Sequence, residues 1–189
     1  MGSVSENVVR HATTPVLLVK LRVVTELGKK VCEFACNKMP RKVLVPTDFS
    51  ECANEALEVV RGLRGAGVEE LVLVHVQDVR KLRPHLAARM EEFNVVDRQR
   101  LETLQQGLSS DGFLVLVRLT EGVPFREILR VADEEDVGLI ALCSHGRSAL
   151  AEVLLDSVSE QVIRRARQAV LVVRCGKVCL SEGRTQMGV

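Results

Sequence analysis

The sequence contains no tryptophan and no tyrosine, and its aromatic side chains are five phenylalanines among 189 residues. It therefore lacks the aromatic platforms on which proteins stack the bases of single-stranded nucleic acids. An excess of one charge is also missing, because 26 basic residues are balanced by 25 acidic residues to a net charge of +1. Such a chain produces no overall field that would attract nucleic acid or an acidic membrane. We therefore expect neither as a partner.

The sequence also lacks long hydrophobic runs. Its longest apolar stretches, such as residues 137–143, are far shorter than the roughly 20 residues that cross a bilayer. No segment resembles a secretory signal peptide, so the six cysteines are expected to lie in the reducing cytoplasm. With 47% apolar and 27% charged residues, the chain has enough hydrophobic side chains to bury a full core.

A segment of 19 residues occurs twice in the sequence. Residues 2–20 and 156–174 align without a gap and share ten identical positions. The chain is also longer than the roughly 150 residues typical of one domain, and only the end of the unit recurs. We therefore expect one complete domain preceded by the remnant of another copy. The expected divisions are a C-terminal remnant of the preceding copy at 1–22, a partly helical linker at 23–40, the complete domain at 41–174 and a tail at 175–189.

The repeated segment predicts a helix followed by a strand. In the complete copy, Ser157 and Glu160 have the spacing of a capping box at the start of a helix. Residues 169–173 are rich in valine and predict a strand. The first copy repeats this pattern. Its strand at 16–19 is expected to pair with the edge of the last strand, either within its own chain or in a second chain.

Strands and helices alternate from residue 41 onward. Short apolar strands are expected at residues 43–45, 71–76, 113–119, 139–142 and 169–173. Segments with apolar residues at helical spacing separate these strands. Buried strands joined through helices are typical of a parallel sheet that is covered on both faces. The predicted fold class is α/β, with a doubly wound five-stranded parallel sheet and an extra N-terminal helix and strand.

Two loops of this predicted sheet are candidates for a binding site. Ligands of doubly wound sheets bind beyond the carboxyl ends of the strands, where the strand order reverses. The loop after the first strand covers residues 46–49, and the loop after the fourth strand covers residues 143–156. We therefore look for functional residues in these two segments.

The residues in and around these loops resemble the universal stress protein family. The resemblance extends over residues 41–174. Its motifs are Val43–Ser50, Leu71–Val76, Gly122–Pro124, Ser144–Ser148 and Leu154–Glu160. It implies a flavodoxin-like (adenine nucleotide alpha hydrolase-like) sandwich that is commonly dimeric through its last strand, in a family whose members divide into those that bind ATP and those that do not.

The resemblance also implies a nucleotide site. ATP-binding members hold the phosphates with Gly-x-x-Gly, nine further residues and Gly-Ser or Gly-Thr, and the matching positions here are Cys143, Gly146, Asp156 and Ser157. Two of the three glycines are replaced, and Asp156 places a carboxylate where phosphates would bind. The expected cofactor-binding residues are Pro46, Thr47, Asp48, Val76, Leu142, Cys143, Gly146, Arg147, Asp156, Ser157, Val158 and Ser159.

The functional hypothesis is a cytoplasmic stress-response domain that acts by self-association or by binding an unidentified regulatory protein. Its nucleotide pocket is expected to be degenerate: no cofactor binds firmly, and the candidate ligands ATP and AMP are weakened by Asp156 and Cys143. The expected partner is a second copy, in a homodimer, or the chain itself, in an intrachain pseudo-dimer through the last strand and residues 16–19. Two alternatives remain open: an ATP- or AMP-binding switch with an intact site, and a slow nucleotide hydrolase.

Some of these residues also suit simpler structural functions. Asp48 suits a turn at the entry to a helix, and His75 suits a hydrogen-bonded position in the core. No Gly-x-Ser-x-Gly elbow occurs, so no catalytic residues are expected and the protein is not predicted to be an enzyme. The spacing of Cys32 and Cys36, and of Cys175 and Cys179, also occurs in ordinary helix packing. No histidine flanks these pairs, so we expect no metal site.

Overall fold

The computed structural model describes residues 7–9, 11–26, 29–34, 40–78, 80, 90–143 and 158–174. Part of the predicted phosphate motif lies outside this range: Gly146, Arg147, Asp156 and Ser157. The same holds for Cys36, Cys175 and Cys179. Among the described residues, no helix is both long and apolar enough to cross a membrane.

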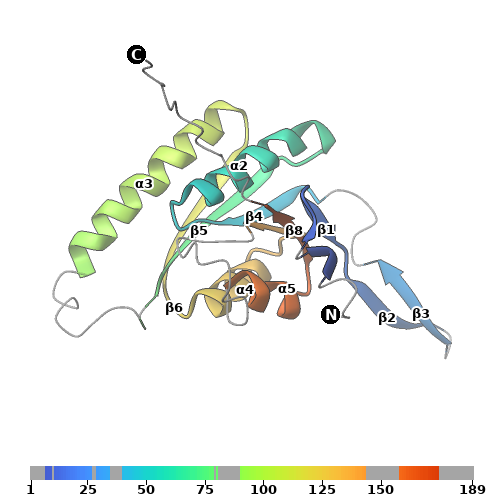
Figure 1. Ribbon diagram of the computed structural model, residues 1–189. Coiled ribbons are helices and arrows are strands. Elements are labelled where there is room, and N and C mark those ends of the chain that lie inside the picture. The colour runs from blue at the N-terminus through green and yellow to red at the C-terminus, as the bar shows by residue number, and fades with distance from the viewer. Residues whose placement is uncertain are drawn as a thin grey trace, which may run out of the picture.

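A six-stranded sheet forms the centre of the molecule, with the strand order β1-β8-β7-β4-β5-β6 (Figure 1). Its strands are β1 (Val16–Leu18), β4 (Lys42–Pro46), β5 (Glu70–Asp78), β6 (Leu114–Gly122), β7 (Leu139–Cys143) and β8 (Ala169–Val173). The five strands from β4 to β8 are parallel, and β1 is antiparallel to β8. The predicted doubly wound α/β fold is confirmed.

Helices cover both faces of the sheet. They are α2 (Glu51–Gly62), α3 (Met90–Ser110), α4 (Pro124–Glu134) and α5 (Val158–Arg165), and the short 3-10 helix η1 (Leu63–Ala66) follows α2. Figure 1 shows α2 and α3 above the sheet and α4 and α5 below it. Each face has its own hydrophobic core, and alternate residues of the central strand β4 belong to each: Val43 and Val45 to the upper core, and Leu44 to the lower core.

Helices form between the strands, where apolar residues at helical spacing predicted them. Ser50 caps α2, because its hydroxyl oxygen accepts a hydrogen bond from the Ala53 backbone N–H at 3.2 Å. Pro124 occupies the first turn of α4, where its missing N–H costs no hydrogen bond. In α3, Leu101 is buried, whereas Val96 is 44% exposed. The helix therefore packs into the hydrophobic core through its second half.

The N-terminal segment packs against the last strand of the same chain. Residues 7–9 and 11 are helical, and Val16, Leu17 and Leu18 of β1 pair with Val172, Leu171 and Val170 of β8. Lys20 Nζ donates a hydrogen bond to the Ile163 carbonyl oxygen at 2.7 Å, and burial lowers the pKa of Lys20. These contacts attach the segment both to the sheet and to the C-terminal end of α5.

The segment between β1 and β4 contains strands rather than the partly helical linker that was expected. β2 (Leu21–Glu26) and β3 (Lys29–Phe34) form an antiparallel two-stranded sheet, which extends away from the main sheet in Figure 1. The β-branched residues Val23 and Val24 of β2 and Val31 of β3 favour extended backbone. The two strands are separated by a two-residue Leu-Gly connection, a length typical of β-hairpins. The expected helical character is therefore wrong for these residues.

Candidate functional site

The candidate site lies where β4 and β7 separate at their carboxyl ends. β4 pairs with β7 only through Val43–Leu139 and Leu44–Ile140. Beyond these pairs, β4 continues along β5 to Pro46, and β7 continues along β8 to Cys143. The strand order reverses here, because the chain runs outward from β4 through β5 and β6 and then returns to β7 on the other side. Such a switch point is where open α/β sheets bind ligands.

The turn that leaves β4 is held by its own polar side chains. The Thr47 N–H donates to the Val74 carbonyl oxygen at 2.9 Å, and Thr47 Oγ1 accepts from the Phe49 N–H at 3.0 Å. Asp48 Oδ1 accepts from the Ser50 N–H at 3.1 Å and from the Ser50 hydroxyl at 2.5 Å. Phe49 has a positive φ of 61°. The turn is therefore built in one conformation, and Asp48 is bound to the cap of α2.

His75 supports this turn from the neighbouring strand. Its Nδ1 donates to the Thr47 carbonyl oxygen at 2.7 Å, and its Nε2 lies 3.4 Å from Asp97 Oδ2 of α3. The centroid of the Phe49 ring lies 4.5 Å from that of the His75 ring. The half-buried His75 is thus hydrogen-bonded beneath the turn, which agrees with the expected structural function.

The other wall of the site is the junction of β7 with α5. The Ser159 hydroxyl donates a hydrogen bond to the Cys143 carbonyl oxygen at 2.7 Å. This contact places the first turn of α5, which begins at Val158, at the carboxyl end of β7. The N-terminus of a helix carries unpaired N–H groups and partial positive charge, which favour anions such as phosphate.

Other predicted site residues lie on β7, which borders the gap, and on β5, the next strand beyond β4. Val76 of β5 is half-buried and packs against the lower core. Leu142 of β7 is 5% exposed and belongs to the same core. Pro46, Thr47 and Asp48 form the turn on one side of the gap. The structure therefore brings the described members of the predicted set to one edge of the sheet.

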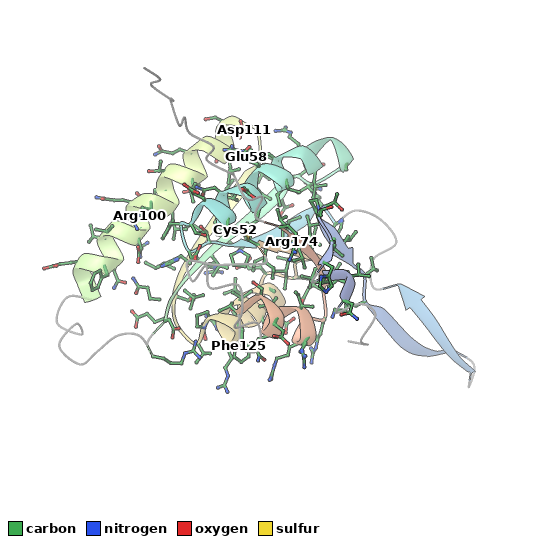
Figure 2. All side chains as sticks on the ribbon, viewed as in Figure 1. Cys52, Glu58, Arg100, Asp111, Phe125 and Arg174 are labelled. Atoms are coloured by element: carbon green, nitrogen blue, oxygen red, sulfur yellow. A yellow bond between two sulfur atoms is a disulfide. The ribbon has the colours of Figure 1, made fainter. Side chains whose placement is uncertain are left out.

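A disulfide between Cys52 and Cys143 crosses the base of the site, and sequence reasoning missed it. The two Cα atoms are 5.8 Å apart, and the residues are 91 positions apart in the sequence. Figure 2 shows Cys52 where α2 lies over the sheet. A signal was present in the predicted topology, because a flavodoxin-like order puts the helix after the first strand over the end of the fourth strand. Sequence reasoning considered only cysteines four positions apart.

The described residues of the site combine a few polar groups with an apolar surface. No group of three or more histidine, cysteine or acidic side chains is placed to hold a metal ion among the residues that the structure describes. The turn offers carbonyl, hydroxyl and carboxylate oxygens beside apolar strand residues, and α5 offers its N-terminal N–H groups. This combination of an apolar surface with a few polar groups is typical of sites for small organic ligands.

Comparison with known proteins relates the chain to proteins of one family. The universal stress protein family model matches residues 39–174. Universal stress protein MJ0577 of Methanocaldococcus jannaschii is 34% identical over 155 residues, which cover 72% of this chain and 96% of that protein. Its solved structure is similar with a TM-score of 0.67 at 35% identity, covering 72% and 97% of the two chains.

Two solved structures from Archaeoglobus fulgidus extend this comparison. A universal stress protein of strain DSM 4304 is 26% identical with a TM-score of 0.63, and the match covers 94% of this chain and 55% of that protein. Another, a complex with dAMP, shares the fold at 20% identity and a TM-score of 0.52, over 70% and 96% of the two chains. From the family match and the MJ0577 identity together, the chain belongs to the universal stress protein family.

Proposed function

We propose that this chain acts in the stress response by self-association or by binding a regulatory protein, and that its nucleotide pocket has kept its adenine side and lost much of its phosphate side. The observation that carries the proposal is the separation of β4 and β7 at the switch point, with an ordered polar turn on one wall. The alternatives are a fully functional ATP or AMP switch and a slow nucleotide hydrolase.

The adenine side is supported by the turn after β4. Its backbone is held by the Thr47 hydrogen bonds to Val74, Phe49 and His75 before any ligand arrives. A ligand that binds there does not have to order the turn, so less free energy is lost on binding. The half-buried Pro46 and Val76 add apolar surface next to it. Adenine, whose flat ring is mostly apolar and whose edges are polar, suits such a surface.

The phosphate side is weakened by the replacement of two motif glycines. Asp156 brings a negative charge into the segment that precedes α5. Two like charges about 4 Å apart repel by about 4 kcal/mol at the effective dielectric constant of a protein surface. ATP would lose more from this repulsion than AMP because it carries more phosphate charge. We therefore expect AMP to bind better than ATP.

The intrachain pseudo-dimer, one of the two expected forms of self-association, is supported by the register of the pair β1 and β8. In the internal repeat, Val16, Leu17 and Leu18 correspond to Val170, Leu171 and Val172. Leu17 pairs with its own equivalent, Leu171. Val16 pairs with the equivalent of Leu18, and Leu18 pairs with the equivalent of Val16. This is the symmetry of a two-fold interface between two copies of one strand. The segment thus imitates half of a dimer within one chain.

Titration calorimetry with AMP and with Mg-ATP tests the pocket. We expect weak AMP binding and weaker ATP binding by the unaltered chain. Asp156→Gly should increase ATP affinity by more than tenfold, because removing one repulsion of even 1.4 kcal/mol changes an equilibrium tenfold. The matched control is Glu152→Gln, an acidic residue of the same segment outside the motif, which should leave the ratio of the two affinities unchanged.

Two results would contradict the proposal. Tighter binding of ATP than of AMP by the unaltered chain would favour the intact switch, and release of phosphate from bound ATP would favour the hydrolase. We also propose that the protein is cytoplasmic and is not an enzyme.

A further inference from the structure

The Cys52–Cys143 bond joins the two walls of the candidate site. Cys52 lies in the first turn of α2, two residues after the cap Ser50, which binds Asp48 of the turn. Cys143 is the last residue of β7, and its carbonyl oxygen accepts the hydrogen bond from Ser159 of α5. The bond therefore connects the turn on the adenine side with the helix on the phosphate side through a few covalent and hydrogen-bonded steps.

We propose that Cys52 and Cys143 are a reversible redox site that reacts with small-molecule disulfides, and that the bond between them strengthens nucleotide binding in the adjoining pocket. The second half rests on the proposed function, since its measured ligand is a nucleotide. The Cα–Cα distance of 5.8 Å lies in the range of about 4.4–6.8 Å found for disulfides. The backbone thus holds both cysteines where the bond can form and break without rearrangement of the sheet.

The exposure of the two cysteines gives the order of the reaction. Cys52 is 5% exposed, whereas Cys143 is half-buried at the end of its strand. The Cys143 thiolate therefore attacks one sulfur of the oxidant, forms a mixed disulfide and releases one small thiol. The Cys52 thiolate then attacks Cys143 Sγ and releases the second small thiol. Two protein thiols are oxidised, one small disulfide is reduced, and the two thiol protons leave on the released thiols.

The bond changes the freedom of the empty pocket. α2 and β7 are separated by most of the domain in sequence, so without the bond only packing and hydrogen bonds fix the turn relative to α5. Binding to the reduced form must then restrict more arrangements of the two walls. In the oxidised form, the disulfide already restricts the arrangements of the two walls.

The test uses the full chain after equilibration with oxidised glutathione or with dithiothreitol. Peptide mapping by mass spectrometry should find Cys52 linked to Cys143 only in the oxidised sample. Calorimetry with AMP should give a dissociation constant about fivefold or more lower for the oxidised sample, the size of a typical coupling. The oxidised sample should also melt about 5–10 °C higher. Cys52→Ser should behave like the reduced chain under both conditions, and the control Cys32→Ser should keep the full response.

Each outcome decides one part of the inference. Equal AMP affinity in both samples would overturn the coupling and leave the proposed nucleotide site standing. AMP binding in neither sample would overturn the pocket and the coupling together. A Cys52–Cys143 peptide that does not form with oxidised glutathione, or does not open with dithiothreitol, would overturn the redox site whatever the nucleotide does.

Discussion

Gly138 leaves no room for a side chain where β7 begins. A Cβ atom added to it would lie 2.6 Å from Cβ and 2.9 Å from Cγ of Pro40, whose ring cannot rotate away. The backbone of Gly138 is also bound on both sides, because its N–H donates to the Lys42 carbonyl oxygen at 3.2 Å and its carbonyl accepts from the Ala169 N–H at 3.3 Å. The strand cannot shift without losing these contacts.

We therefore predict that Gly138→Ala lowers the free energy of unfolding by about 1–3 kcal/mol, the cost of forcing an extra methyl group into a packed place. Chemical denaturation followed by circular dichroism measures this change. The matched control is Gly65→Ala in η1, where a Cβ would meet nothing within 4 Å and the change should be near zero or slightly stabilising. Equal stability of both variants would show that Pro40 moves aside.

The candidate site shows how far single residues could be predicted. The turn Pro46–Asp48 and the end of β7 were found because a motif and the expected strand order pointed to the same loops. His75 was correctly expected to be hydrogen-bonded, but its contact with Asp97 was not foreseen, because no sequence pattern relates a strand residue to a helix residue 22 positions later. The Cys52–Cys143 bond was missed for the same reason, since it depends on tertiary neighbours.

At the level of elements, the strands that are buried on both faces were the most predictable. β4, β7 and β8 consist almost wholly of buried apolar residues, and no other element type explains such short runs between helices. β2 and β3 were not predicted, because LRVVTE and KKVCEF mix polar and apolar residues without the strict alternation that identifies a strand. Helical spacing correctly predicted α3, although Val95 and Val96 in its first half are exposed.

Glu135, at the C-terminal end of α4, ties this helix to two strands. Its Oε2 accepts a hydrogen bond from Lys42 Nζ of β4 at 2.9 Å, and its Oε1 accepts one from Arg118 Nε of β6 at 3.0 Å. The hydrogen bonds from Arg118 and Lys42 lower the pKa of Glu135 below its ordinary value of 4.5. The carboxylate is therefore ionised wherever the folded protein is normally studied.

We predict that Glu135→Gln lowers the free energy of unfolding by roughly 1 kcal/mol at pH 7, the value of a partly exposed ion pair. Because the folded pKa is depressed, the contribution is fully present above pH 4.5 and is lost as the pH falls through the lower folded value. Thermal melts of both proteins from pH 7 to pH 3 should therefore converge only at the acidic end. A difference that persists unchanged at pH 3 would contradict this account.

The whole molecule is organised around one protected sheet edge. All five residues of β8 are buried, and without β1 this uncharged strand would expose its free backbone groups along one side. Exposed edges of this kind pair with other chains. β1 occupies the edge through the pairs with Val170, Leu171 and Val172, and Lys20 fastens the segment to α5. A second copy of the chain therefore finds the edge of β8 already taken.

We predict that deleting residues 1–20 converts the chain into a dimer that pairs through two β8 strands, because the two-fold register of β1 on β8 shows that this edge accepts its own equivalent. Light scattering coupled to size-exclusion chromatography measures the mass. Leu17→Pro, which removes one backbone N–H from β1, should also raise the measured mass toward that of a dimer without shortening the chain. Deleting only residues 1–6 retains β1 and should leave the mass unchanged. If the chain lacking residues 1–20 keeps the mass of the intact chain and melts at the same temperature, β1 does not protect the edge and the proposed intrachain pseudo-dimer of β1 and β8 is wrong.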